Sequence, residues 1–354
     1  MDPTAIPFLG VLLQLIAYLI DVLPDIAPIA MALAAPIALG AMCGVIGERS
    51  GVVNIGIEGM MLIAAFAGFL VAGLVAQAIP MEPWPVFGAT PALLVGVLAA
   101  VLSAMGVGLL HAWLSVTVRA DQIISGTIIN IAALGLTGYF NRLWITANPR
   151  LGAGTLQSFV PPPELTSLPL VGWIIKAFFN QGPITMSVIV IVIVLQVLLF
   201  RSRWGLRTRA VGEEPAAADS VGIDVIRLRY RNVIMAAGLA GLAGAYLTLE
   251  ATGSFQNGMT TGRGFIALAA VIFGRWTPIG AWGAALMFSV ADALRVAIGI
   301  RPPPGELGHL LGSIPSEFYA SLPFVLTIIV LAGVVGRSVA PAADGRPYAK
   351  EGQA

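Results

Sequence analysis

The sequence predicts an all-α fold, a polytopic transmembrane helix bundle, and three observations lead to that class. Of the 354 residues, 58% are hydrophobic and only 10% are charged, whereas a soluble domain carries about 25% charged residues. Apolar windows of about 20 residues, the length that crosses a bilayer core of about 30 Å, recur along most of the chain. The 41 glycines suit such a bundle, because small residues let helices approach closely in lipid.

About ten apolar spans are predicted from this pattern. The first lacks a positively charged segment ahead of it, so we expect it to be retained as structure and not cleaved as a signal peptide. The spans at 121–141 and 262–280 are polar or interrupted by glycine, which predicts broken helices. In chain order the spans lie at 5–23, 28–46, 52–79, 89–117, 121–141, 184–200, 233–250, 262–280, 281–298 and 321–336.

The distribution of Lys and Arg predicts the orientation, because these residues are retained on the cytoplasmic side of short loops. The segment 201–231 holds seven arginines and is therefore expected inside. Counting outward through ten spans places thirteen of the nineteen Lys and Arg residues inside, together with both termini. The Pro-rich stretches 80–91, 149–169 and 302–304 then form stiff loops on the outside.

This topology divides the chain into a membrane domain and a tail. Residues 1–336 form the membrane domain, which includes a cytoplasmic loop at 201–232, and residues 337–354 form a cytoplasmic tail. The segments 50–58 and 261–269 each follow a polar break and open an apolar span from opposite sides. That arrangement is typical of an inverted repeat; chance similarity between apolar helices is the alternative.

The cytoplasmic loop contains a predicted short helix at 213–221. Gly212 precedes it, acidic residues open its first turn, Pro215 lies near the first helical position, and Gly222 closes it. The arginines of the loop are explained by the positive-inside rule and by contact with anionic membrane lipid, but topology does not require a capped helix. The helix is therefore predicted to dock on a cytosolic partner.

Three motifs in order resemble one family, over residues 28–336. The loop is similar to the coupling loop of ABC importer permeases for ribose-type sugars, branched-chain amino acids and nucleosides, with the pattern Gly212-x-x-Pro215-x-Ala217-Ala218-x-x-x-Gly222-Ile223. Residues 47–61 resemble the subgroup of these permeases assigned to nucleoside uptake. Residues 258–269, followed by Gly274-Arg275-Trp276-x-Pro278, lie where the family places its second-half signature.

The resemblance implies how such a chain works and with what it assembles. In this family the loop helix inserts into a cleft of an ATP-binding subunit and transmits its closure; here the coupling residues would be Gly212, Glu213, Pro215, Ala217, Gly222 and Ile223. A second permease subunit, identical or related, and an extracytoplasmic solute-binding protein are implied as partners, in the cytoplasmic (inner) membrane of a prokaryote. The subgroup favours nucleosides as substrate, with ribose-like sugars as the alternative.

The residues also predict a substrate path. Asn54 and Glu58 are four positions apart, so on a helix they would share one face within or near the membrane. They could bind ribose hydroxyls or base edges; alternatively, Glu58 accepts hydrogen bonds from backbone or from Arg263 and ties two helices together. Asn130 and Phe265 complete the predicted path, and Phe265 could stack on a nucleobase. The alternative roles are interhelical hydrogen bonding for Asn130 and packing for Phe265.

Absent motifs narrow the class of protein further. The chain has no phosphate-binding Gly-x-x-x-x-Gly-Lys-Ser/Thr motif and only two lysines, so ATP and Mg²⁺ are expected on a partner subunit. No catalytic triad or metal-ligand spacing occurs, so we expect no enzyme activity, no cofactor and no metal on this chain, and no nucleic-acid partner. An ion-coupled secondary transporter is the rival of another class; it would not need the short docking helix.

Overall fold

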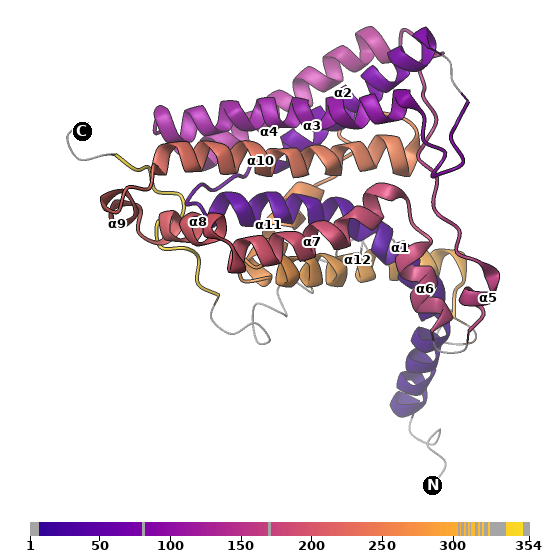
Figure 1. Cartoon of the computed structure of the whole chain (residues 1–354). Helices are drawn as coiled ribbons and strands as arrows, with labels where there is room; N and C mark the ends of the chain where they lie inside the picture. Colours follow the sequence, from indigo (N-terminus) through magenta and orange to yellow (C-terminus); the bar gives the residue numbers. More distant parts are fainter. Residues whose placement is uncertain are drawn as a thin grey trace. The chain divides into compact units, whose positions relative to one another are not determined.

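The computed structural model describes residues 7–79, 82–168, 171–303 and 338–349, with isolated positions between 305 and 325. These residues form helices and no strands, which confirms the all-α class (Figure 1). Seven helices in the described part are long and apolar enough to cross a membrane. The chain divides into two compact units, each described separately below.

The first unit contains Met1–Ala34, Phe159–Gln181 and Leu286–Gly336. Its helices are the first part of α1 (Pro7–Glu48), α5 (Pro163–Thr166), α6 (Gly172–Phe179) and most of α12 (Pro278–Ile300). The core of this unit packs α1 against α12 through Tyr18, Val22, Ile26, Ala30, Ala293 and Ala297. Beyond the apolar core, Arg301 forms an ion pair with Asp21 at 2.8 Å.

The second unit contains Ala35–Ser158, Gly182–Ala285 and Arg337–Ala354. It holds the end of α1, α2 (Ile57–Ala78), α3 (Pro91–Ala112), α4 (Gln122–Phe140), α7 (Pro183–Arg201), α8 (Arg203–Glu213), α9 (Pro215–Ser220), α10 (Val225–Ala245) and α11 (Arg263–Phe273). Three helices continue as π-helical turns, at Trp113–Thr117, Asn141–Ile145 and Tyr246–Thr252. This unit contains all the residues considered below as functional.

Small residues hold the centre of the second unit together, where α2, α3 and α10 pack on one another. A Cβ added to Gly68 would lie 3.1 Å from the carbonyl oxygen of Gly96, and one added to Gly241 would lie 2.7 Å from the Cα of Val101. Side chains at these positions would push the helices apart. The glycine-rich composition is thus used as expected for helices in lipid.

Several helices begin where a polar residue caps them. Thr90 accepts a hydrogen bond from the backbone of Leu93 at 3.2 Å, and Asp121 accepts from Ile123 and Ile124 at 2.8 and 3.0 Å. Asp224 caps α10 in the same way. These caps satisfy orphan N–H groups and set where α3, α4 and α10 begin.

The predicted spans need two corrections. The spans 5–23 and 28–46 form one helix of 42 residues, α1, because the prolines between them are tolerated inside an apolar helix whose neighbours compensate the lost backbone bonds. The span 121–141 is an unbroken α4, whereas 262–280 holds the eleven-residue α11, a broken helix as predicted. The predicted span 321–336 lies almost entirely outside the described residues.

Candidate functional site

The chain between α1 and α2, residues 49–56, is largely non-helical, and side chains of α3 and α4 bind its backbone. We call this segment the α1–α2 junction. Gln122 Oε1 accepts from the N–H of Val53 at 2.7 Å, and His111 Nε2 lies 3.0 Å from the Val53 carbonyl. Because that nitrogen must donate, the other ring nitrogen of His111 accepts from Ser125, 3.1 Å away. These bonds replace those that a continuous helix would make.

Asn130 lies near the middle of α4 and bonds the chain on both sides of the start of α2. Its Nδ2 donates to the carbonyl of Ile55 at 3.0 Å, and its Oδ1 accepts from the N–H of Gly59 at 2.7 Å. Both ends of the amide are therefore used inside the protein. The geometry corresponds to the interhelical role that the sequence left open for this residue.

Asn54 does not share a helix face with Glu58, because α2 begins only at Ile57. The expectation of a common face is therefore wrong. The Asn54 side chain is 3% exposed, and its Nδ2 lies 3.4 Å from the sulfur of Met60 and 3.8 Å from that of Cys43. Its Oδ1 is buried and has no hydrogen-bond partner among the described residues.

Glu58 joins the N-terminus of α2 to the N-terminus of α11. Its Oε1 accepts from the N–H of Gly262 at 2.8 Å, and its Oε2 accepts from the N–H of Gly264 at 2.6 Å. These donors are among the orphan amides of α11, where the helix dipole favours negative charge. The structure thus gives Glu58 the backbone partners that one interpretation expected. Arg263 donates instead to the loop ahead of it, including Thr261 Oγ1 at 2.6 Å.

The loop 253–262 leads into α11 alongside α4 and carries polar residues that the sequence reasoning missed. Asn257 Oδ1 accepts from Asn141 Nδ2 at 2.9 Å, while Glu58 holds the other end of the loop at the depth of mid-α4. Irregular backbone at membrane depth is tolerated where it is buried or lines a water-filled cavity. Within this loop, Asn257 is exposed. Phe265, 48% exposed, lies just beyond the loop. In the sequence, the run of polar residues between two apolar spans was the signal that could have identified this loop.

The loop at 201–232 contains α8 and α9. Ser202 caps α8 by accepting from the N–H of Gly205 at 3.1 Å, and Pro215 is the first residue of α9, as predicted. Gly222, at φ +84°, ends the turn after α9. The short helix covers 215–220 and not 213–221: Gly212 and Glu213 lie in α8, so the expected acidic first turn is wrong. A side chain on Gly212 would collide with the carbonyl group of Arg49.

The two faces of α9 differ. Ala218 is buried, together with Val211 and Val225, whereas Ala216 and Ala217 are exposed. Beside α9 is a groove of about 350 Å³, lined by Asp219, Gly222, Ile223, Asp224, Val225, Ile226 and Tyr348. An anchored helix with a free apolar face and an adjacent groove is suited to receive another protein.

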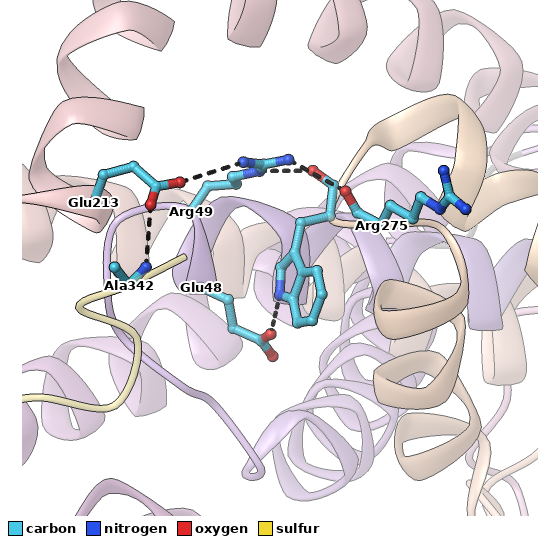
Figure 2. Close-up of polar contacts among 6 residues, drawn as sticks. Glu48, Arg49, Glu213, Arg275 and Ala342 are labelled. Carbon is cyan, nitrogen blue, oxygen red and sulfur yellow. Dashed lines mark hydrogen bonds and ion pairs between the residues drawn. The ribbon is translucent and has the colours of Figure 1, made fainter. Parts of the chain in front are cut away.

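Arg49, the first residue of the α1–α2 junction, connects this junction to the end of α8 (Figure 2). Its Nε and Nη2 donate to the carbonyls of Trp276 and Arg275, at 2.9 and 3.2 Å. Its Nη1 forms an ion pair with Glu213 at 3.9 Å, and Trp276 donates to Glu48. Burial lowers the pKa of the Arg49 guanidinium, and Glu213 partly offsets this effect. The end of α1, the turn after α11 and the end of α8 thus meet at one cation.

No cluster of three or more metal-ligating side chains occurs in the described part of the chain. The described site consists of side-chain hydrogen bonds to backbone groups, helix ends and the exposed face of α9.

Comparison with known proteins identifies the family of the chain. A family model described as branched-chain amino acid transport system permease component matches residues 28–331. The guanosine ABC transporter permease NupQ of Bacillus subtilis is 36% identical over 94% of this chain and 98% of its own length. The nucleoside ABC transporter permease NupC of Lactococcus lactis is 38% identical over 89% of this chain and 93% of its own length. The putative glucose ABC transporter permease TsgC13 of Haloferax volcanii is 34% identical over 83% of this chain and 86% of its own length.

No solved structure matches this chain. The family match covers most of the chain, and the two nucleoside permeases are similar along nearly their whole length. The chain belongs to the family of branched-chain amino acid transport system permease components.

Proposed function

We propose that this chain is the permease subunit of an ABC importer that carries nucleosides across the cytoplasmic (inner) membrane, using ATP hydrolysed by a partner subunit. The observation that carries the proposal is the linkage from exposed α9 through Glu213 and Arg49 to the α1–α2 junction. The names of the relatives NupQ and NupC support the substrate class.

The path runs along loop 253–262 and the start of α11. Asn257 and Asn141 offer amide donors and acceptors for a base edge or a ribose hydroxyl, and exposed Phe265 offers a face on which a base can stack. Glu58, Asn54 and Asn130 shape the path from behind, because their described contacts are with the protein itself. A neutral nucleoside needs no charged partner at the site.

Energy enters at the coupling residues 212–223. Two ATP-binding subunits, carrying ATP and Mg²⁺, dock on α9 and the adjacent groove of this chain and of a second permease subunit. Closure of the ATPase pair displaces α9, and Arg49 transmits that displacement to the junction. A solute-binding protein delivers the nucleoside outside, while both termini lie in the cytoplasm.

Reconstitution of the whole importer in proteoliposomes tests this proposal. We expect nucleoside uptake to need ATP and to be lost when the phosphate-binding lysine of the partner ATPase is replaced. Deletion of 212–222 should abolish uptake; ATP-driven uptake that survives this deletion would show that the coupling assignment is wrong. Uptake driven by an ion gradient without ATP would favour the secondary-transporter alternative.

Ribose-like sugars are the second candidate substrate, because two relatives are named as glucose permeases, one of them as a putative one. Competition decides between the two. An excess of unlabelled nucleoside should block uptake of labelled nucleoside, whereas free ribose or glucose at the same concentration should not. Preference for the free sugar would overturn the nucleoside assignment.

A further inference from the structure

Residues 338–349 pack as an ordered part of the coupling region, although the sequence suggested a simple tail. We call them the C-terminal strap; in Figure 1 it is the yellow segment near α8 and α9. Its first residue, Ser338, donates to the carbonyl of Ile272 in α11 at 2.8 Å. Pro341 and Ala343 are buried. The strap therefore contacts the body of the second unit from its beginning.

The middle of the strap binds the end of α8. The N–H of Ala343 donates to the Gly212 carbonyl at 2.9 Å, and the N–H of Ala342 donates to Glu213 Oε2 at 3.1 Å (Figure 2). Glu213 thus joins the strap through one oxygen and Arg49 through the other. Gly212 and Glu213 are both among the residues assigned to coupling.

A buried arginine joins the strap to the α1–α2 junction. Arg229 of α10 is 1% exposed; its Nε donates to the carbonyl of Ser50 at 3.0 Å, and its Nη1 donates to the carbonyl of Arg346 at 2.9 Å. The strap also packs directly on the junction, because a Cβ added to Gly51 would lie 3.0 Å from the Ala343 carbonyl oxygen. One strap therefore contacts both ends of the proposed linkage.

The end of the strap supports α9 from its buried side. Tyr348 packs against the cluster of Val211, Ala218 and Val225, which anchors α9 to α8 and α10. The strap thus contacts the residues that anchor α9. Without it, the Glu213 and Arg229 groups would lose partners.

We propose that the C-terminal strap is a positioning element of the transport cycle: it makes α9 and the α1–α2 junction move as one body. The inference rests on the proposed function, since it assigns the strap a part in transmitting ATPase closure. A flexible connection would let α9 follow the ATPase while the junction stayed in place. Loss of the strap should therefore separate ATP hydrolysis from transport.

The test uses the complete importer in proteoliposomes and measures nucleosides transported per ATP hydrolysed. A chain ending at residue 337 removes the strap, and its matched control ends at Ala349. Ala342→Pro removes the single N–H that faces Glu213, at the second position of the 341–344 turn, which proline tolerates. Arg229→Gln weakens the junction contact; its control, Arg346→Ala, removes one cation but keeps the carbonyl that accepts from Arg229.

We expect the transport ratio to fall by about 5- to 150-fold without the strap, the usual range of coupling between two sites, while ATP hydrolysis continues. Ala342→Pro and Arg229→Gln should lower the ratio less, and both controls should keep it. If the shortened chain fails to assemble, the transport ratio of Ala342→Pro decides whether the strap proposal holds. Wild-type ATP-driven uptake with an unchanged ratio in Ala342→Pro and Arg229→Gln would overturn the strap proposal alone. Wild-type uptake that needs no ATP would overturn the proposed function as well.

Discussion

At the scale of single residues, the structure accounts for a carboxylate at membrane depth. A charge there is expensive unless it is paired or hydrogen-bonded. Glu58 meets this requirement with two backbone N–H groups at the start of α11. Its contacts thus indicate a structural role at the junction of α2 and α11.

Glu58→Gln tests that role. The amide replaces one accepting oxygen by a donor that faces another N–H, so we expect a loss of about 1.5–3 kcal/mol of stability, the range for hydrogen bonds to charged groups. Thermal unfolding in detergent measures the change. Glu214→Gln, the same charge change on an exposed carboxylate, should have no effect. Weaker nucleoside binding with unchanged unfolding would instead show that Glu58 contacts substrate.

Asp344 of the strap gives a pH dependence. Burial raises its pKa from 3.8 to about 7, while the Gly345 N–H and nearby Arg229 oppose the rise; Glu48 also lies within electrostatic range. Because the folded pKa is the higher one, its stabilising contribution is fully present below about pH 4 and is lost as the pH rises through about 7. The strap should therefore bind more weakly in alkaline solution.

Hydrogen-exchange protection factors of amides 338–349 measure this effect. We expect lower protection at pH 8 than at pH 5.5 in the wild type, and little difference in Asp344→Asn, which stays neutral. An equal loss of protection in Asp344→Asn would assign the pH dependence to another group.

At the scale of elements, the proposed function depends on the places where helices begin and end. The breaks before α2 and α11 bring two helix N-termini together at Glu58. Gly264 allows this approach, because a Cβ there would lie 2.6 Å from the Cα of Glu58. The two ends are therefore packed through backbone and cannot admit a larger residue.

Gly264→Ala should force α2 and α11 apart and reduce nucleoside uptake strongly. Gly135→Ala is the matched control, since a Cβ on that residue meets nothing within 4 Å, and alanine favours a helix by up to about 1 kcal/mol. Uptake by the assembled importer and thermal unfolding measure both variants. Equal uptake in Gly264→Ala and the wild type would show that this close approach is unnecessary.

The sequence predicted those elements that have a local signal. Apolar length predicted α7, and Pro215 with Gly222 predicted α9. The sequence pattern did not predict that α1 is continuous. Prolines usually end helices in soluble chains but are tolerated inside membrane helices. The partners of Glu58 could not be predicted from the sequence, because they are backbone N–H groups and every residue except proline supplies one. The strap carries no hydrophobic period, so its packing could not be predicted.

At the scale of the whole molecule, composition was the strongest predictor. Apolar length and glycine content predicted a helical membrane bundle, and seven apolar helices in the described part agree with it. The candidate path, the coupling helix and the strap all belong to the second unit. A displacement at α9 therefore has a continuous route, through Glu213 and Arg49, to the α1–α2 junction.

The central claim is that this route connects ATP hydrolysis to nucleoside transport, and Glu213→Gln measures it most directly. This variant loses the charge that binds Arg49 while α9 keeps its exposed face. In the reconstituted importer we predict continued ATP hydrolysis with fewer nucleosides transported per ATP, lower by about fivefold or more. An unchanged ratio of nucleosides to ATP in Glu213→Gln would contradict the account.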